Sequence, residues 1–144
     1  FDLVYGILKP AVADYRGTDK RAEATPVAWS HYERAIDAEL SARPDVRFFV
    51  ATDQDGVADA VARRAGADRV LVAGAEVSRD GVALHYRRRD GAARRGEEAL
   101  CDAWLLSRCS RVYHGYSNLI GGVVMLSPDL PRVHLGLSPG VVEP

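Results

Sequence analysis

The chain has 144 residues, with 19 basic and 20 acidic side chains, a formal net charge of -1 and 47% hydrophobic residues. Its length suits one domain, and its 13 glycines, 7 prolines and 27% charged residues exclude a disordered or collagen-like chain. A net charge so close to zero provides no basic surface for nucleic acid. We therefore expect residues 1–144 to form a single globular domain that does not bind nucleic acid.

The first third of the chain predicts a strand and then a helix. Residues 11–15 form a short strand-like run that ends in a polar turn at residues 16–20. Thr25 and Pro26 have the character of an N-cap and a first helical residue. The apolar residues that follow recur at helical spacing, which predicts one buried face made of Trp29, Tyr32, Ile36 and Leu40.

The middle of the chain continues the alternation. Residues 46–51 are β-branched and aromatic enough to predict a strand. A helix with Val57 and Val61 on its apolar face should follow and end at Gly66, and residues 69–73 predict the next strand. Residues 74–96 hold five arginines between 87 and 95 and glycines at positions 81, 91 and 96, which predicts a long loop.

The last third predicts two further helices and two strands. Glu97 and Glu98 would place acids in the first turn of a helix. Its buried face is predicted to consist of Leu100, Ala103, Trp104 and Ser107. A strand at residues 112–114, a helix capped by Ser117 or Asn118, and a strand at residues 132–135 complete the pattern.

Alternating strands and helices predict an α/β fold, with a Rossmann-like parallel sheet, right-handed crossovers and flanking helices. In such sheets ligands bind outside the carboxyl ends of the strands. Polar segments follow three predicted strands, at residues 16–20, 52–55 and 115–118. We therefore expect these three segments to share one edge of the sheet and to form one site.

Two of these segments suit an anion. The planar guanidinium of Arg16 matches phosphate oxygens, and Gly17 beside it lets a ligand approach the backbone. The alternative for Arg16 is a surface ion pair with a neighbouring aspartate. Ser117 and Asn118 are either an ordinary helix cap or a cap whose backbone N–H groups face a phosphate. Neither a phosphate loop nor Gly-x-Gly-x-x-Gly occurs, which disfavours triphosphatases and dinucleotide oxidoreductases.

The segment after residue 51 carries a rival interpretation. An apolar strand followed by Asp53, Asp55 and Gly56 resembles the first motif of haloacid-dehalogenase-type phosphatases, in which paired aspartates act with Mg²⁺. That chemistry also needs a downstream lysine, but both lysines, Lys9 and Lys20, lie upstream. A Mg²⁺-dependent aspartyl phosphatase is therefore retained as a disfavoured alternative. The four histidines have no metal-site spacing, so no metal is predicted.

Three segments, taken in order, resemble the signature motifs of α-1,6-fucosyltransferases and nodulation fucosyltransferases. Residues 14–20, Asp-Tyr-Arg-Gly-Thr-Asp-Lys, resemble the motif His-x-Arg-x-Thr-Asp-Lys, and residues 48–53 resemble an apolar strand ending in Ala-Thr-Asp. The third motif is similar to the set Leu84-His85-Tyr86, Arg95-Gly96, Asp102-x-x-Leu105-Leu106-Ser107 and Tyr116-Ser117-Asn118. The resemblance extends over residues 9–136.

The resemblance implies the carboxy-terminal, donor-binding lobe of a GT-B glycosyltransferase, with the amino-terminal acceptor lobe absent from this chain. Such an enzyme transfers fucose from GDP-fucose, or another sugar from a GDP-sugar, to a hydroxyl of a glycan or other acceptor with inversion. It requires neither a metal nor another cofactor. A second possibility is a lobe that binds the nucleotide sugar without transferring it.

The resemblance also implies a role for each matching residue. Arg16 would contact the β-phosphate of the donor, Asp102 would bind guanine, and Glu23 would take the proton of the acceptor, oriented by Lys20. The implied catalytic residues are Arg16, Asp19, Lys20 and Glu23. The implied donor-binding residues are Arg16, Gly17, Asp53, Asp102, Tyr116, Ser117 and Asn118.

Neither a membrane segment nor a disulfide framework is predicted. The longest uncharged stretch, residues 112–128, is too short and too polar to cross a bilayer. Cys101 and Cys109 have neither zinc-site spacing nor the pattern of a secreted domain, so we expect two reduced thiols in or near the core. Together these features predict a soluble cytoplasmic protein of bacterial type.

Overall fold

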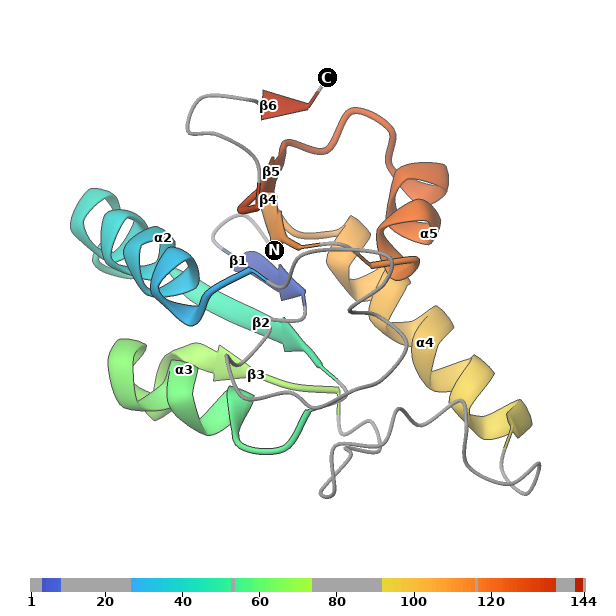
Figure 1. Cartoon of the computed structure of the whole chain (residues 1–144), viewed down its shortest axis with the longest axis horizontal. Coiled ribbons are helices and arrows are strands. Elements are labelled where there is room, and N and C mark those ends of the chain that lie inside the picture. The colour runs from blue at the N-terminus through green and yellow to red at the C-terminus, as the bar shows by residue number, and fades with distance from the viewer. Residues whose placement is uncertain are drawn as a thin grey trace.

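A computed structural model describes residues 27–52, 54–73, 92–115 and 117–136, and the backbone alone of residues 4–8 and 142–143. The chain has a mixed α/β architecture in which helices flank one sheet (Figure 1). In the order β3-β2-β1-β4-β5-β6, the sheet contains β1 (Val4–Leu8), β2 (Arg47–Ala51), β3 (Val70–Leu71), β4 (Arg111–His114), β5 (Arg132–His134) and β6 (Val142–Glu143).

Strand β1 lies in the middle of the sheet and pairs in parallel with β2 on one side and β4 on the other. Strands β3 and β5 extend the parallel pairing outward, and β6 adds an antiparallel edge. From β1 the chain first moves outward through β2 and β3, and then returns to the other side of β1 for β4 and β5. This order is compatible with a Rossmann-like arrangement.

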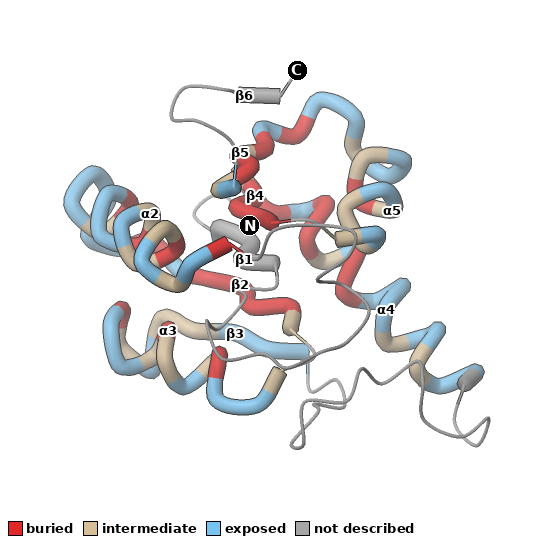
Figure 2. Tube along the Cα trace, in the orientation of Figure 1, coloured by how far each residue is buried: buried red, intermediate tan, exposed pale blue. Residues whose placement is uncertain are grey.

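Helices cover both faces of the sheet. They are α2 (Trp29–Ala42), α3 (Val57–Ala65), the short 3₁₀ helix η1 (Ala67–Arg69), α4 (Ala92–Ser107) and α5 (Leu119–Leu126). Successive residues of β2 point to opposite faces, so Phe48 packs under α2 and α3 whereas Phe49 packs under α4 and α5. The most deeply buried parts of the chain therefore run along β2 and β4 (Figure 2).

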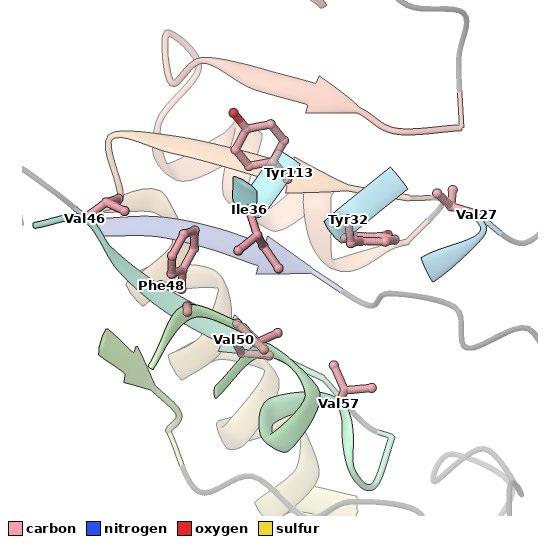
Figure 3. Packing of buried hydrophobic residues seen from close by; sticks show 10 residues of the cluster. Val27, Tyr32, Ile36, Val46, Phe48, Val50, Val57 and Tyr113 are labelled. Atoms are coloured by element: carbon pink, nitrogen blue, oxygen red, sulfur yellow. The ribbon is translucent and has the colours of Figure 1, made fainter. Parts of the chain in front are cut away.

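The core beneath α2 and α3 follows the predicted helical spacing. Tyr32 and Ile36 of α2 meet Phe48 and Val50 of β2 and Val57 of α3 (Figure 3). Full burial of each large apolar side chain contributes about 1.5–3 kcal/mol to the free energy of unfolding. The helix register of α2 is therefore determined by this contact, as the sequence predicts.

A buried carboxylate joins the end of α2 to the start of β4. Glu39 lies on the buried face of α2, and Arg111 places its Nη1 3.0 Å from Glu39 Oε1. The hydroxyl of Tyr113 donates a hydrogen bond to the same oxygen. Burial, reinforced by this hydrogen bond to Glu39, raises the pKa of Tyr113 to about 12. The cluster of these three residues stabilises the amino edge of the sheet, opposite to the predicted site.

Several element boundaries differ from the sequence predictions. The first described strand is β1 at Val4–Leu8, which was not predicted, and the predicted strand at residues 11–15 lies outside the described residues. Helix α2 begins at Trp29, with Ala28 as an N-cap that makes no side-chain hydrogen bond, rather than at Thr25. Helix α4 begins at Ala92 rather than Glu97, and β6 was not predicted.

The predicted buried face of α4 is correct for Ala103 and Ser107, which are buried, and wrong for Leu100 and Trp104. Leu100 is 71% exposed and Trp104 49% exposed, whereas Asp102, Ala103 and Leu106 are buried. The reason is that α4 carries apolar residues on two sides, and only the side with Ala103 and Leu106 contacts the sheet. The same rotation exposes Cys101, which was predicted near the core; Cys109 is buried, and both thiols are free.

No helix in the described part of the chain is both long enough and apolar enough to span a membrane.

Candidate functional site at the carboxyl edge of the sheet

The carboxyl ends of the three central strands lie level with one another. Leu8 of β1 is aligned with Ala51 of β2 on one side and with His114 of β4 on the other. The residues that follow, Thr52 and Gly115, therefore lie on either side of the end of β1. This arrangement confirms that two of the three polar segments share one edge of the sheet.

The third predicted segment lies within residues 9–26, outside the described part of the chain. It contains the predicted site residues Arg16, Gly17, Asp19, Lys20 and Glu23. The described chain resumes at Val27, which is buried. A Cβ atom at Gly115 would lie 3.1 Å from Val27 Cγ2, and one at Gly136 would lie 3.0 Å from the same atom. The segment therefore leaves from Leu8 and returns at Val27, and both residues lie beside the end of β4.

The backbone after β4 is packed tightly against α2. A Cβ atom at Gly115 would lie 3.1 Å from the hydroxyl oxygen of Tyr32. Burial raises the pKa of Tyr32 well above its usual value, and a hydrogen bond with the Gly115 backbone opposes this shift. A glycine is thus required at position 115, because Tyr32 and Val27 occupy the space that a side chain would fill.

Two buried histidines end adjacent strands at this edge. His114 and His134 are opposite each other in the β4–β5 pairing, with their ring centroids 5.1 Å apart and the ring planes at 81°. His114 Nδ1 lies 2.9 Å from the carbonyl oxygen of Gly115 and therefore carries the proton in this contact. His134 Nδ1 instead accepts a hydrogen bond from the Gly136 N–H at 3.1 Å.

These histidines were not predicted as a pair. The sequence feature that could have identified them is that each histidine ends a strand and is followed by a glycine within two residues. Within the described ranges, no group of three or more histidine, cysteine, aspartate or glutamate side chains is placed to hold a metal ion.

The start of α5 provides a hydroxyl and a helix N-terminus. Asn118 occupies the N-cap position, but its exposed side chain makes no capping hydrogen bond. Ser117 supplies the cap instead, because its Oγ accepts a hydrogen bond from the Leu119 N–H at 3.2 Å. The Ser117 hydroxyl retains its own proton for donation, at the positive end of the helix dipole. Tyr116, the third predicted residue of this motif, lies outside the described residues.

The turn after β2 is shaped by its own polar groups. Thr52 Oγ1 accepts a hydrogen bond from the Gln54 N–H at 3.1 Å, and Gly56 has a φ of 76°, a conformation that favours glycine. Asp53 lies outside the described residues, and Asp55 is exposed. The turn leads directly into α3 and follows β2 at the candidate edge.

Asp102 is a buried acid in the helical layer next to α5. Its neighbour Ala103 lies 3.4 Å from the position of a Cβ atom at Gly122, so the helix that carries Asp102 packs against α5. Burial, reinforced by the charge of Glu98 one turn earlier, raises the pKa of Asp102 to about 6. The carboxyl is therefore mostly ionised at neutral pH, at the expense of stability.

Comparison of the chain with protein-family models, with curated proteins and with solved structures finds no match. The interpretation of this edge therefore depends on its own geometry and chemistry.

The close packing at Gly115 predicts a position-specific effect of adding one methyl group. Gly115→Ala should lower the free energy of unfolding by about 1–3 kcal/mol, because Tyr32 and Val27 must move. The matched control is Gly121→Ala in α5, where a Cβ atom meets nothing within 4 Å and alanine should stabilise the helix by up to about 1 kcal/mol. Urea unfolding measures both; equal effects would contradict the packing described.

The raised pKa of Asp102 predicts that the effect of Asp102→Asn on stability depends on pH. The folded protein holds the Asp102 proton more tightly than the unfolded chain does, so wild-type stability falls as pH rises from about 4 to about 6. Asparagine does not titrate, so the variant should gain in melting temperature relative to wild type across this range. Asp129→Asn, at an exposed position, is the control. A difference from wild type that is constant between pH 4 and pH 7.5 would disprove the assignment.

Proposed function

We propose that this chain binds a nucleoside diphosphate sugar at the carboxyl edge of its sheet, as the Rossmann-like donor lobe of a fucosyltransferase-like GT-B glycosyltransferase. The donor is GDP-fucose or another GDP-sugar, and the acceptor is a hydroxyl of a glycan or similar molecule. The observation that carries the proposal is the position of Leu8 and Val27 beside the end of β4. These residues bracket the segment that contains Arg16.

The diphosphate is proposed to lie between that segment and the start of α5. The order of the strands changes direction between β1 and β4, and ligands of parallel sheets bind in the crevice at such a point. The Ser117 hydroxyl and the positive end of α5 would supply hydrogen-bond donors on one side of the diphosphate. Arg16 would supply a bidentate guanidinium from the other side of the diphosphate. The remaining proposed contacts to the nucleotide sugar come from Gly17, Asp53, Tyr116 and Asn118.

Guanine recognition is proposed for Asp102. A carboxylate that accepts two N–H groups matches the guanine edge and does not match the acceptor groups of adenine or uracil. With a pKa raised to about 6, the carboxyl is still mostly ionised at neutral pH, and this role requires the ionised form. Helix α4, which carries Asp102, packs against α5 through Ala103 and Gly122, so the proposed base and diphosphate contacts would come from neighbouring elements.

Sugar transfer with inversion is proposed to use the acceptor-side residues of the same segment. Glu23 would take the proton of the acceptor hydroxyl, with Lys20 and Asp19 orienting it. Arg16 and the start of α5 would stabilise the negative charge that develops on the departing diphosphate. In this mechanism the side chain and helix end compensate the leaving group without a metal ion. A lobe that binds the donor but does not transfer the sugar remains the second interpretation.

Calorimetric titration with GDP tests the diphosphate assignment. Arg16→Ala should weaken binding by about 2–5 kcal/mol, because a charged contact to the diphosphate is lost. Arg16→Lys should also lose affinity, since a single ammonium cannot replace the guanidinium fork. Arg63→Ala, at an exposed position of α3, is the matched control and should bind as wild type does. GDP affinity of Arg16→Ala within about threefold of wild type would refute the assignment.

Turnover separates transfer from binding alone. With GDP-fucose and a panel of glycan acceptors, Glu23→Gln should reduce GDP release about 10²–10⁴-fold with GDP affinity unchanged, and a chelator should have no effect. Wild-type binding without turnover on any acceptor would favour the non-catalytic lobe. Loss of activity on chelation or in Asp53→Asn, with Glu23→Gln fully active, would favour the phosphatase instead.

A further inference from the structure

One face of α4 is apolar in its centre and exposed along its length. We define the α4 stripe as Glu97, Leu100, Cys101, Trp104 and Arg108, which are all exposed. With about 100° of rotation per residue, these five positions fall within an arc of about 100°. The arc is opposite the face that contacts the sheet. Surface helices normally carry polar residues there, and Leu100 at 71% and Trp104 at 49% exposure depart from that pattern.

The order of residues along the α4 stripe is self-complementary. It begins with an acid, Glu97, and ends with a base, Arg108, and both are equally distant from the midpoint between Asp102 and Ala103. Cys101 and Trp104 are symmetric about the same midpoint. Two antiparallel copies would therefore place Glu97 opposite Arg108 of the other copy. Parallel packing would instead oppose like charges, which is unfavourable.

The spacing of the α4 stripe also suits a helix–helix contact. Glu97, Cys101, Trp104 and Arg108 follow one another at steps of four, three and four residues, which is the alternation of a helical packing seam. The Arg108 guanidinium lies 5.5 Å from the ring centre of Trp104. This cation–π contact keeps the positive charge on the stripe, where an acid of a second copy can reach it.

We propose that the α4 stripe is the contact surface between two copies of this chain, related by a two-fold axis with their α4 helices antiparallel. A two-fold contact uses the same surface on both copies, which is what a self-complementary stripe provides. The two Leu100 and two Trp104 side chains form its apolar centre, and two Glu97–Arg108 pairs flank it. The contact is small, so the dimer dissociates in the micromolar range or above. It involves none of the residues assigned to the donor.

Analytical ultracentrifugation in reducing buffer, from about 10 µM to about 1 mM protein, tests the dimer. Wild type should shift from monomer to dimer over this range, and Leu100→Lys should remain monomeric. Glu97→Arg and Arg108→Glu should each weaken the dimer at least about tenfold, because each brings like charges together. The double variant Glu97→Arg/Arg108→Glu should recover wild-type association to within about threefold, since the pairs are then reversed but still opposite.

As a control, Asp45→Arg makes the same charge change as Glu97→Arg, but at an exposed turn, and should leave association unchanged. Melting temperatures show whether each variant is folded. If Leu100→Lys does not fold, the Glu97 and Arg108 charge-reversal variants still test the proposal. A wild type that stays monomeric throughout, a dimer indifferent to Leu100→Lys, or a double variant as weak as the single ones would each overturn the proposal. The first of these results would assign the α4 stripe to a different partner.

Discussion

The parallel pairing of β1 with both β2 and β4 is the constraint on which the rest of the structure depends. Because Leu8 is level with Ala51 and His114, three strands end along one line, and the segments that follow them start side by side. The return of the chain at Val27 reinforces this convergence, since Val27 packs against the backbone beyond β4 and β5. The register of these strands therefore creates the shared edge at which parallel sheets bind ligands, whichever side chains follow them.

The two buried acids of the described chain, Glu39 and Asp102, have different surroundings. Glu39 is paired with Arg111 and Tyr113 at the amino edge, where it joins α2 to β4. Asp102 instead lies buried with a second acid, Glu98, one turn away, and burial raises its pKa. The buried, ionised Asp102 therefore opposes folding at neutral pH. A ligand that donates hydrogen bonds to Asp102 would offset that cost, which is why guanine recognition is proposed for this residue.

Much of the fold was predictable where one physical signal dominated. The face of α2 with Tyr32 and Ile36 and the end of α3 at Gly66 follow from apolar spacing and from a glycine with positive φ. Helix α4 was predicted, but its buried face was assigned partly wrongly, because Leu100 and Trp104 look as apolar as the true buried side, which also carries the polar Asp102. Of the candidate site, the shared edge was predictable from alternating elements. The contacts of Val27 with Gly115 and Gly136 are tertiary, and no local pattern encodes them.

Amide NMR tests most directly the proposed binding of a nucleoside diphosphate at the edge between β1 and β4. In a ¹H–¹⁵N titration with GDP, saturable shifts should concentrate at Gly115 and residues 117–120, with a second group at residues 52–56. Amides at the amino edge, beside Glu39 and Arg111, should move little. Saturable shifts centred on that amino edge, or no saturable shift at any concentration of GDP, would contradict the account.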